Sequence, residues 1–475
     1  MANYYLTTTL PYVNDRPHIG FALEIVQADS LARLRRLLGD EVFFNFGTDE
    51  HGQKIYSKAI EEGTTPQAYA DKYAATFQEL KEALNLSYDA FIRTTDPLHK
   101  SAAQEFWRRC DKNGDIYKKA YKIKYCVGCE LEKTDSELVD GKCPLHPKLD
   151  IQIIEEENYF FRFSKYQNAL SKLYDEHPDF VIPAFRLNEI KSIIRGEGLQ
   201  DFSISRLKSK LPWGVEVPGD PEQVMYVWFD ALINYISTLG WPTDSKKFEA
   251  FWPGLQFAGK DQVRQQAAMW QAMLLSADLP PSKQIFFHGF ITIDGTKMSK
   301  SLGNVIYPTE FVKTYGTDAT RYFLLRHLHP FEDSDFSVAR FKELYNANLA
   351  NGLGNLTARI MKLAEDNLEK PMEKPHLDGM YPPEITRRIS RFEFNSALDM
   401  IWEQIQFLDQ KITETEPFKV VKKDKSAGVA LIGSLVEGLY LIAFELEPFM
   451  PETSEKIKTA VLQNKKPETL FPRLD

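Results

Sequence analysis

The sequence of 475 residues is poor in cysteine, with only four, and has neither a long unbroken apolar run nor an excess of basic residues. The N-terminus lacks a basic segment ahead of an apolar one, so we expect no signal peptide, and the few cysteines favour a reducing cytoplasm. The most apolar stretch, residues 431–450, carries Glu437, Glu445 and Glu447, which predicts an amphipathic helix and no membrane span. The net charge of −9 argues against a protein that coats nucleic acid non-specifically.

Two common phosphate-binding patterns are also missing. The chain has neither a G-x-x-x-x-G-K-[ST] loop nor a strand-borne G-x-G-x-x-G turn. The composition that remains is that of a globular protein, 43% hydrophobic and 26% charged. Its length predicts roughly two to four domains.

The hydrophobic pattern divides the chain into an α/β part, an insertion and a helical part. Residues 4–10 are typical of a strand, 21–39 of an amphipathic helix and 41–52 of a strand that runs into a turn, which predicts a doubly wound parallel sheet. The pattern after Arg340 is almost wholly helical and predicts a helix bundle. We divide the chain into the first half of the α/β domain (1–116), a mostly β inserted subdomain (117–225), the second half (226–308), a linking region (309–345) and a helical domain (346–475).

The stretch "RPHIGFALE", residues 16–24, joins the first strand to the first helix. A helix N-terminus offers free N–H groups to an anion, a Gly in its first turn lets a ligand approach, and His18 could donate to a phosphate oxygen. The alternative is that Pro17 merely starts a helix and His18 lies on the surface. A second motif, "GTKMSKSLGN" at residues 295–304, places Lys297 and Lys300 on a Gly-flanked loop, where they could stabilise charge on a triphosphate. Alone, such a loop is usually a solvated turn.

Together, "PHIG" near one end and "KMSKS" far along the chain resemble the two signatures of the class I aminoacyl-tRNA synthetases. The segments "TTLPYVNDRPHIG", "FGTDEHG", "YVWFDAL", "GKD" and "HGF" extend the resemblance to the methionyl-tRNA synthetase family over essentially the whole chain. The resemblance implies a Rossmann-like catalytic domain that activates L-methionine with ATP and Mg²⁺, releases pyrophosphate and transfers the methionyl group to tRNA(Met). The linking region would then contact the tRNA stem.

The resemblance also implies roles for individual residues. Catalytic roles fall to His18, Lys297 and Lys300. The ATP site would comprise Pro11, Tyr12, His18, Gly20, Phe21, Glu24, Gly259, Asp261, Lys297 and Lys300. The methionine site would comprise Leu10, Tyr12, Asp49, Trp228, Leu232, Tyr235, Gln266 and Trp270. Asp49 would hold the methionine ammonium, since a buried cation needs a paired carboxylate, and Tyr12 could donate to the thioether. For most of the aromatic residues, ordinary core packing is the alternative.

Cys126, Cys129, Cys143 and His146 form the pattern "CVGC…CPLH", two pairs with two residues inside each. Two such knuckles can close a tetrahedral site, which predicts one structural zinc per chain. The alternative is free structural cysteine. The family often carries one or two such knuckles at this place.

In the helical domain, Asn355 and Arg359 lie four residues apart and match the family's anticodon readers. Phe418 takes the place where the family usually has a Trp that stacks on an anticodon base. The sequence ends at "LFPRLD" without the appended tRNA-binding domain of dimeric members, so we expect a monomer. Outside this domain, "KKAYKIKY", residues 118–125, suits either solvated lysines on a strand or RNA contact.

The chain departs from the family pattern at two places. Phe21 stands where the first signature usually ends in a second His, and it could pack as an apolar floor under the nucleotide. Gln262, Gln265 and Gln266 replace apolar, Phe and His residues, and Gln266 takes the place of the His near the methionine side chain. Two alternatives stay open: a cysteinyl ligase, for which only Cys110 lies outside the knuckle, and a non-catalytic RNA-binding protein built on a decayed synthetase.

Overall fold

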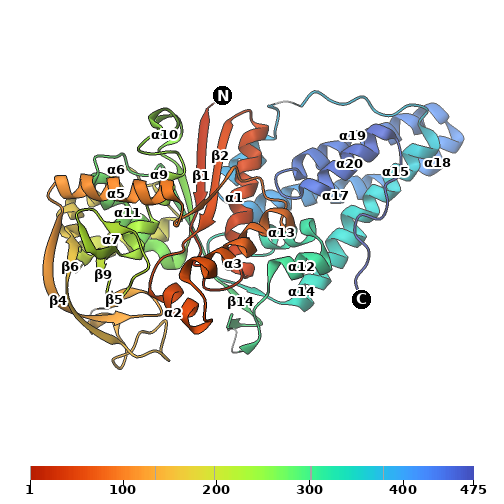
Figure 1. Ribbon diagram of the computed structural model, residues 1–475. Coiled ribbons are helices and arrows are strands. Elements are labelled where there is room, and N and C mark those ends of the chain that lie inside the picture. Colours follow the sequence, from red (N-terminus) through yellow and green to blue (C-terminus); the bar gives the residue numbers. More distant parts are fainter. Residues whose placement is uncertain (1, 134, 197, 300–301, 378) are drawn as a thin grey trace.

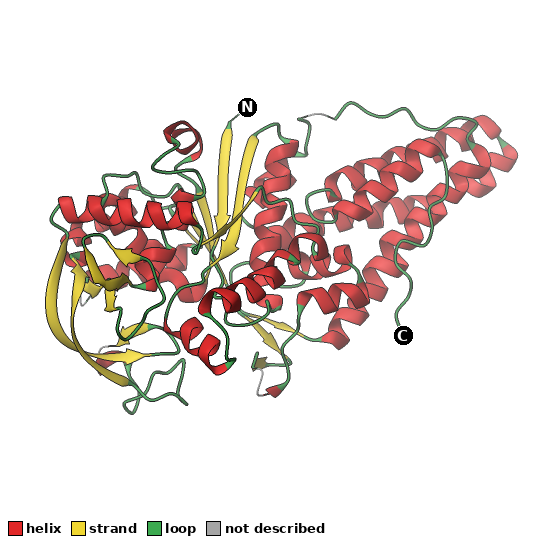
Figure 2. Cartoon of the chain, viewed as in Figure 1, coloured by secondary structure: helices red, strands yellow, loops and turns green. Residues whose placement is uncertain are grey.

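The computed structural model describes residues 2–475 except residues 134, 197, 300–301 and 378. The molecule is elongated, with a parallel sheet near the middle, a β-rich insertion at one end and a bundle of long helices at the other (Figure 1). Helices make up most of the molecule outside the sheet and the insertion (Figure 2). This arrangement confirms the predicted doubly wound α/β fold with an insertion and a helical C-terminal part.

The central sheet has six strands, all paired in parallel. In order across the sheet they are β3 (Ala90–Arg93), β2 (Glu41–Thr48), β1 (Asn3–Thr8), β12 (Leu255–Gly259), β13 (Gln284–His288) and β7 (Val181–Ile182). The chain begins in the middle, adds β2 and β3 on one side, and returns later to add β12 and β13 on the other. Such a reversal is the point at which doubly wound sheets bind ligands, at the carboxyl ends of the strands.

Helices cover both faces of the sheet, each face over its own hydrophobic core. The helices of the first half are α1 (Ile19–Leu37), α2 (Gln53–Glu61), α3 (Pro66–Gln78), α4 (Leu80–Ala83) and α5 (Pro97–Lys112). Those of the second half are α8 (Val227–Ala231), α9 (Asn234–Ser237), α10 (Ser245–Phe251), the 3₁₀ helix η3 (Lys260–Gln262), the π-helix η4 (Gln265–Met269) and α11 (Trp270–Ser276).

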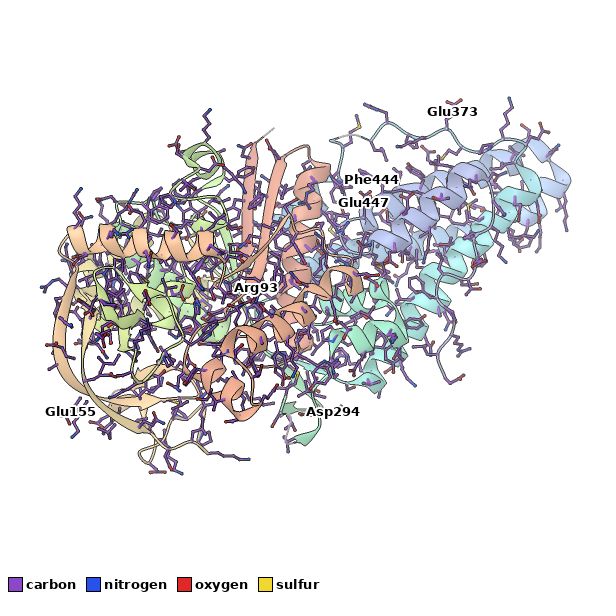
Figure 3. All side chains as sticks on the ribbon, viewed as in Figure 1. Arg93, Glu155, Asp294, Glu373, Phe444 and Glu447 are labelled. Carbon is purple, nitrogen blue, oxygen red and sulfur yellow. The ribbon has the colours of Figure 1, made fainter. Side chains whose placement is uncertain are left out.

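Two arginines form ion pairs with buried carboxyls and connect neighbouring elements of the α/β domain. Arg93, at the end of β3 and near the centre of Figure 3, pairs with Glu50 after β2 at 2.6 Å and with Asp71 on α3 at 2.6 Å. Arg321, fully buried in the C-terminal half, pairs with Asp29 on α1 at 2.8 Å. Because a buried charge needs a partner, these pairs lock the strand end and α1 in place.

The insertion is built on a sheet of β5 (Leu131–Lys133), β4 (Ile116–Cys126), β6 (Gln152–Phe161) and β8 (Phe202–Ser203), with a second sheet of β10 (Glu216–Val217), β11 (Asp220–Met225) and β9 (Ser205–Leu207). It also contains η1 (Asp135–Glu137), η2 (Phe163–Tyr166), α6 (Gln167–Glu176) and α7 (Ala184–Arg195). Since β7 lies between α6 and α7 in the chain yet pairs with β13, part of residues 117–225 belongs to the main sheet. The domain boundaries stay a prediction.

The lysine- and tyrosine-rich stretch at residues 118–125 lies within β4. Lys118 pairs with Asp220 at 2.9 Å, and Lys122 pairs with Glu155 at 3.5 Å on the outer edge of the insertion (Figure 3). These pairs agree with solvated lysines on a strand.

Beyond β13 follow the small sheet β15 (Thr296–Lys297), β14 (Ile291–Ile293) and β16 (Ser334–Phe336), and then the helices. The helices are α12 (Pro308–Tyr315), α13 (Thr317–Arg326), α14 (Val338–Leu344), the π-helix η6 (Tyr345–Gly354), α15 (Asn355–Asn367), α16 (Pro383–Ser390), α17 (Phe394–Thr415), α18 (Pro417–Lys423), α19 (Lys425–Leu446) and α20 (Pro451–Gln463). The apolar pattern at 383–415 thus forms two helices, separated where Phe392 takes a positive φ of 62°.

The expectation that no segment is apolar enough to cross a membrane is wrong by length and composition. Helix α19 has a mean hydropathy of 1.9 over its most apolar window. It packs against α15, α17, α18 and α20, and Leu435, Leu439 and Leu446 on it are buried. An apolar helix surrounded by other helices is typical of the core of a bundle.

Candidate active site

His18 caps the N-terminus of α1, and its ring leans back over the first turn. Its Nδ1 accepts a hydrogen bond from the N–H of Gly20 at 3.1 Å, and burial lowers the pKa of His18 to about 4. The ring is therefore neutral near pH 7 and carries its proton on Nε2. A Cβ on Gly20 would lie 2.9 Å from His18 Cε1, so glycine is needed for this close approach. The result is one imidazole donor beside the free N–H groups of a helix end.

Phe21 packs directly against that imidazole. The two rings are stacked, with centroids 4.4 Å apart and planes 29° apart, and the other side of Phe21 meets Phe77 edge-on. Phe21 therefore supports the His18 ring from one side and is itself supported by Phe77.

The KMSKS loop lies next to this helix end. Ile19 N–H donates to Ile306 O at 2.9 Å, and Met298 Cε is 3.7 Å from the position that a Cβ on Gly20 would take. Lys297, at the end of β15, is exposed. Lys300 lies outside the described residues. The described residues Met298 and Ile306, on the two sides of Lys300, thus lie beside the start of α1.

Glu24 connects three elements at the carboxyl edge of the sheet. Its Oε1 accepts from the N–H and hydroxyl of Thr9 at 2.8 and 2.6 Å, and its Oε2 lies 2.9 Å from Nε2 of His288 at the end of β13. His288 Nδ1 lies 2.7 Å from Gly289 O, which can only accept, so Nδ1 carries a proton and Nε2 faces Glu24. Burial alone would lower the pKa of His288, but Glu24 and the Gly289 carbonyl together raise it above 6.5. The raised pKa favours the protonated imidazole, in which a second N–H is available to Glu24 Oε2.

Asp49 follows β2 and is buried, yet its Oδ1 has no hydrogen-bond partner among the described residues. Burial, followed by the charges of Asp230 and Glu130, raises the pKa of Asp49 well above its usual value. Its backbone pairs with that of Tyr12, which brings it beside the end of β1. A buried carboxyl with an unused oxygen in an acidic environment is a site for a cationic group.

Tyr12 is already engaged within the protein. Its hydroxyl lies 2.6 Å from Glu130 Oε2 and 2.7 Å from His51 O. Glu130 also accepts from the N–H of Lys54 at 2.8 Å. The Tyr12 hydroxyl thus donates within the protein, to Glu130 and the His51 carbonyl, and not to a ligand.

The residues expected around the methionine side chain come from three segments of the chain. Leu10 follows β1, Trp228 is on α8, Leu232 follows it, Tyr235 is on α9, Gln266 is in η4, and Trp270 begins α11. Gln266 Nε2 donates to the Tyr235 hydroxyl at 2.7 Å, and the rings of Tyr235 and Trp270 have centroids 5.8 Å apart. Burial raises the pKa of the Tyr235 hydroxyl, and the charges of Glu24 and Asp49 add to this rise.

The residues expected around ATP come from the carboxyl ends of β1 and β12 and from the start of α1. Pro11 follows β1 and is buried, Gly259 ends β12, and Asp261 lies in η3 with its side chain exposed. A Cβ on Gly259 would lie 2.8 Å from Asp261 Oδ1, so a larger residue there would collide with the acid. The remaining residues expected around ATP, His18, Gly20 and Glu24, lie in α1 or at its N-cap.

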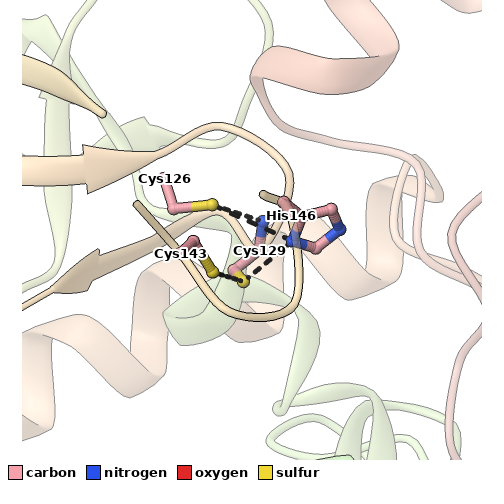
Figure 4. Close-up of side chains that lie close together, drawn as sticks. All are labelled: Cys126, Cys129, Cys143 and His146. Carbon is pink, nitrogen blue, oxygen red and sulfur yellow. Dashed lines mark hydrogen bonds between the residues drawn. The ribbon is translucent and has the colours of Figure 1, made fainter. Parts of the chain in front are cut away.

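The four knuckle residues lie together at the tip of the insertion (Figure 4). Their ligand atoms, three Sγ and His146 Nδ1, all lie within 4.8 Å of one another, with Cys129 Sγ 3.4 Å from Cys143 Sγ and 3.2 Å from His146 Nδ1. A Cβ on Gly128 would lie 2.4 Å from the His146 ring, so Gly128 leaves the room that this ring occupies. Three thiols and an imidazole at these separations fit the tetrahedral donor set of structural zinc.

Comparison with known proteins identifies the family. The model of the class I tRNA synthetases (M) matches residues 4–151 and 148–361. The chain is 42% identical to the methionine–tRNA ligase of Thermotoga maritima, over 98% of this chain and 76% of that protein. It is 44% identical to that of Thermosynechococcus vestitus, over 96% and 89%. The chain belongs to the methionyl-tRNA synthetases.

The fold agrees with this family. A Mycobacterium tuberculosis methionyl-tRNA synthetase in complex with methionyl-adenylate superposes with a TM-score of 0.90 at 36% identity, covering 100% of this chain and 99% of that one. An apo form of the same M. tuberculosis enzyme superposes with a TM-score of 0.84 at 32% identity. The alternative of a cysteinyl ligase is therefore set aside.

The residues that match the anticodon readers of the synthetases lie far from the sheet, in the bundle. Asn355 and Arg359 are one turn apart on α15, Asn355 exposed and Arg359 paired with Asp409 on α17 at 2.5 Å. Phe418, on α18, keeps 41% of its surface exposed. An exposed ring and a partly exposed guanidinium can both contact nucleic acid.

A buried hydrogen-bonded cluster formed by Asp230, two histidines and Ser237 was missed in the sequence analysis. Asp230 lies 2.5 Å from His51 Nδ1 and 2.8 Å from His99 Nε2, and His99 Nδ1 lies 2.9 Å from the Ser237 hydroxyl. These contacts lower the pKa of Asp230 against the opposing effect of burial. His51 and Asp230 do stand in the motifs "GTDEHG" and "YVWFDAL", but nothing in the sequence pairs them. The role of His288 in "HGF" was missed as well, because nothing in the sequence pairs it with Glu24.

Proposed function

We propose that this chain activates L-methionine with ATP to methionyl-adenylate, releases pyrophosphate, and transfers the methionyl group to tRNA(Met). The observation that carries the proposal is the buried Asp49 with its unused oxygen, at the point where the sheet reverses. An α-ammonium group fits this carboxyl, because it would supply the charge and the donors that Asp49 lacks. The α-carboxylate would then lie toward the N-terminus of α1.

The chemistry needs positioning and charge stabilisation more than covalent help. As the carboxylate attacks the α-phosphorus, negative charge grows on the departing pyrophosphate. His18 would donate to it from Nε2, together with the N–H groups at the start of α1, while Lys297 and Lys300 approach from the loop and withdraw afterwards. ATP would enter with Mg²⁺, and Pro11, Gly259 and Asp261 would line the adenosine side. Glu24 would act by holding Thr9 and His288.

Cys126, Cys129, Cys143 and His146 would bind one zinc ion as a structural metal. All four positions of a tetrahedral ion are taken by these side chains, so no place is left for water or substrate, and its contribution is to hold the two knuckles together. The chemical step makes no use of it.

The tRNA would lie along the length of the molecule, with its anticodon at the far end of the bundle and its acceptor end at the sheet. Asn355, Arg359 and Phe418 would read the anticodon, and residues 309–345 would contact the stem. We propose a monomer that acts in the cytoplasm, outside any membrane.

Pre-steady-state quench-flow with radiolabelled ATP tests the adenylation step. His18→Ala should slow adenylate formation at least tenfold with the methionine dissociation constant nearly unchanged, because the lost hydrogen bond is made to charge that develops in the reaction. The matched control is His177→Ala, an exposed histidine after α6 that lies outside the proposed sites and should leave the rate unchanged. A harmless His18→Ala would refute the phosphate role.

A further inference from the structure

A chain of buried side-chain amides runs from outside the site to the Tyr235 hydroxyl. Its members are Gln271 on α11, Ser282 in the loop before β13, Gln256 on β12, Gln266 in η4 and Tyr235 on α9. All five are buried. Burying polar groups costs free energy, and such a network stabilises the fold only when every hydrogen bond in it has a donor and an acceptor.

The backbone sets the direction of the bonds at one end. Gln271 Oε1 accepts from the backbone N–H of Ser282 at 3.0 Å, and Gln271 Nε2 donates to the backbone carbonyl of Gln266 at 2.9 Å. A backbone N–H can only donate and a carbonyl can only accept, so the orientation of the Gln271 amide is fixed. Gln271 Nε2 also reaches the Ser282 hydroxyl at 3.1 Å, which leaves the Ser282 proton to be donated onward.

This direction passes along the remaining members. The Ser282 hydroxyl donates to Gln256 Oε1, which turns Gln256 Nε2 toward Gln266 Oε1 at 3.2 Å. Gln266 Nε2 then donates to the Tyr235 hydroxyl at 2.7 Å. Because the Tyr235 hydroxyl accepts from Gln266, its own proton has to point away from Gln266 and is free to be donated to another group.

We infer that Gln256, through Gln266, is a positioning residue that makes Tyr235 a hydrogen-bond donor toward the substrate side chain, so the site selects a side chain with an acceptor atom. A thioether sulfur is a weak acceptor, whereas a methylene at the same position accepts nothing. Gln256 touches neither substrate nor reacting atoms. The inference rests on the proposed placement of the methionine side chain beside Tyr235.

The test compares methionine with norleucine, which carries a methylene in place of the sulfur. The readout is the ratio of kcat/KM for the two amino acids in ATP–pyrophosphate exchange. Gln256→Met keeps the length of the side chain but removes its donor, and should lower the ratio about three- to tenfold, the fold-change that one neutral hydrogen bond commands. A merely structural defect would weaken both substrates equally and leave the ratio unchanged.

Gln265→Met is the matched control, since Gln265 is the buried neighbour of Gln266 and makes no hydrogen bond to the chain of amides among the described residues. Its ratio should equal that of the unaltered protein. If Gln256→Met does not fold, Ser282→Ala removes the donor that orients Gln256 and should lower the ratio in the same direction.

Tyr235→Phe separates the inference from the function on which it rests. It should lower the ratio, and adding Gln256→Met to it should have no further effect. If Tyr235→Phe leaves the ratio unchanged, the methionine side chain does not lie beside Tyr235 and the proposed placement fails. If Tyr235→Phe lowers the ratio but folded Gln256→Met does not, the placement stands and the role of Gln256 is refuted.

Discussion

Replacing Asp49 by Asn tests the ammonium site while keeping the shape of the side chain. Asp49 is buried beside two other acids, and one of its oxygens is unused. Removing one partner of a buried charge pair costs about 3–5 kcal/mol, and each 1.4 kcal/mol is tenfold. We therefore expect Asp49→Asn to raise the dissociation constant for methionine by about two to three orders of magnitude, with ATP binding nearly unchanged.

The pH dependence of the methionine dissociation constant is a second, independent test of the Asp49 site. In the free protein the pKa of Asp49 is raised, so its carboxyl keeps a proton to higher pH than usual. Methionine binding needs the carboxylate and releases that proton. Affinity for methionine should therefore rise with pH until the free carboxyl has ionised, and Asp49→Asn should abolish this rise.

Isothermal titration calorimetry with methionine at several pH values measures both effects, and thermal unfolding reports the fold. Since the variant removes a repulsive buried carboxyl, its unfolding temperature at pH 8 should not fall. A methionine affinity within threefold of the unaltered protein, or an equal loss of ATP affinity, would refute the reasoning.

Three further changes follow from the site. Metal analysis should find about one zinc per chain, and Cys126→Ser should lose it and unfold at lower temperature; a zinc-free protein whose Cys126→Ser variant folds and acylates normally would remove the site. Arg359→Ala should impair tRNA charging while methionine-dependent pyrophosphate exchange stays nearly intact, and an equal loss in both assays would make Arg359 structural. Phe21→His should raise the rate of adenylate formation less than tenfold, because the stack of Phe21 on His18 already holds the imidazole in place, whereas a larger gain would reveal an uncompensated defect.

The elements that carry motifs could be predicted because their signals are local. A strand followed by "PHIG" and a helix, and four metal-ligand residues at knuckle spacing, each specify structure within a short stretch. The bond between Glu24 and His288 joins residues 264 positions apart, and the Asp230 pair with His51 joins residues 179 apart. No periodicity or spacing reports on such pairs, because they exist only after the two halves of the sheet have come together.

The apolar helix α19 and the break at Phe392 illustrate a different limit. Composition alone makes α19 resemble a membrane span, and only its neighbours in the bundle mark it as a core helix. At residues 383–415 the apolar spacing continues through Phe392, although the backbone turns there with a positive φ. The side chain of Phe392 is buried against Phe286 and Phe257, so tertiary packing overrides the local preference for helix.

Pyrophosphate exchange with each of the standard amino acids in turn tests the central claim most directly. The account predicts ATP–pyrophosphate exchange that depends on methionine, with every other amino acid far weaker, because Asp49 and Tyr235 together select an α-amino acid with an acceptor in its side chain. Exchange that another amino acid supports better than methionine, or no exchange with any of them, would contradict it.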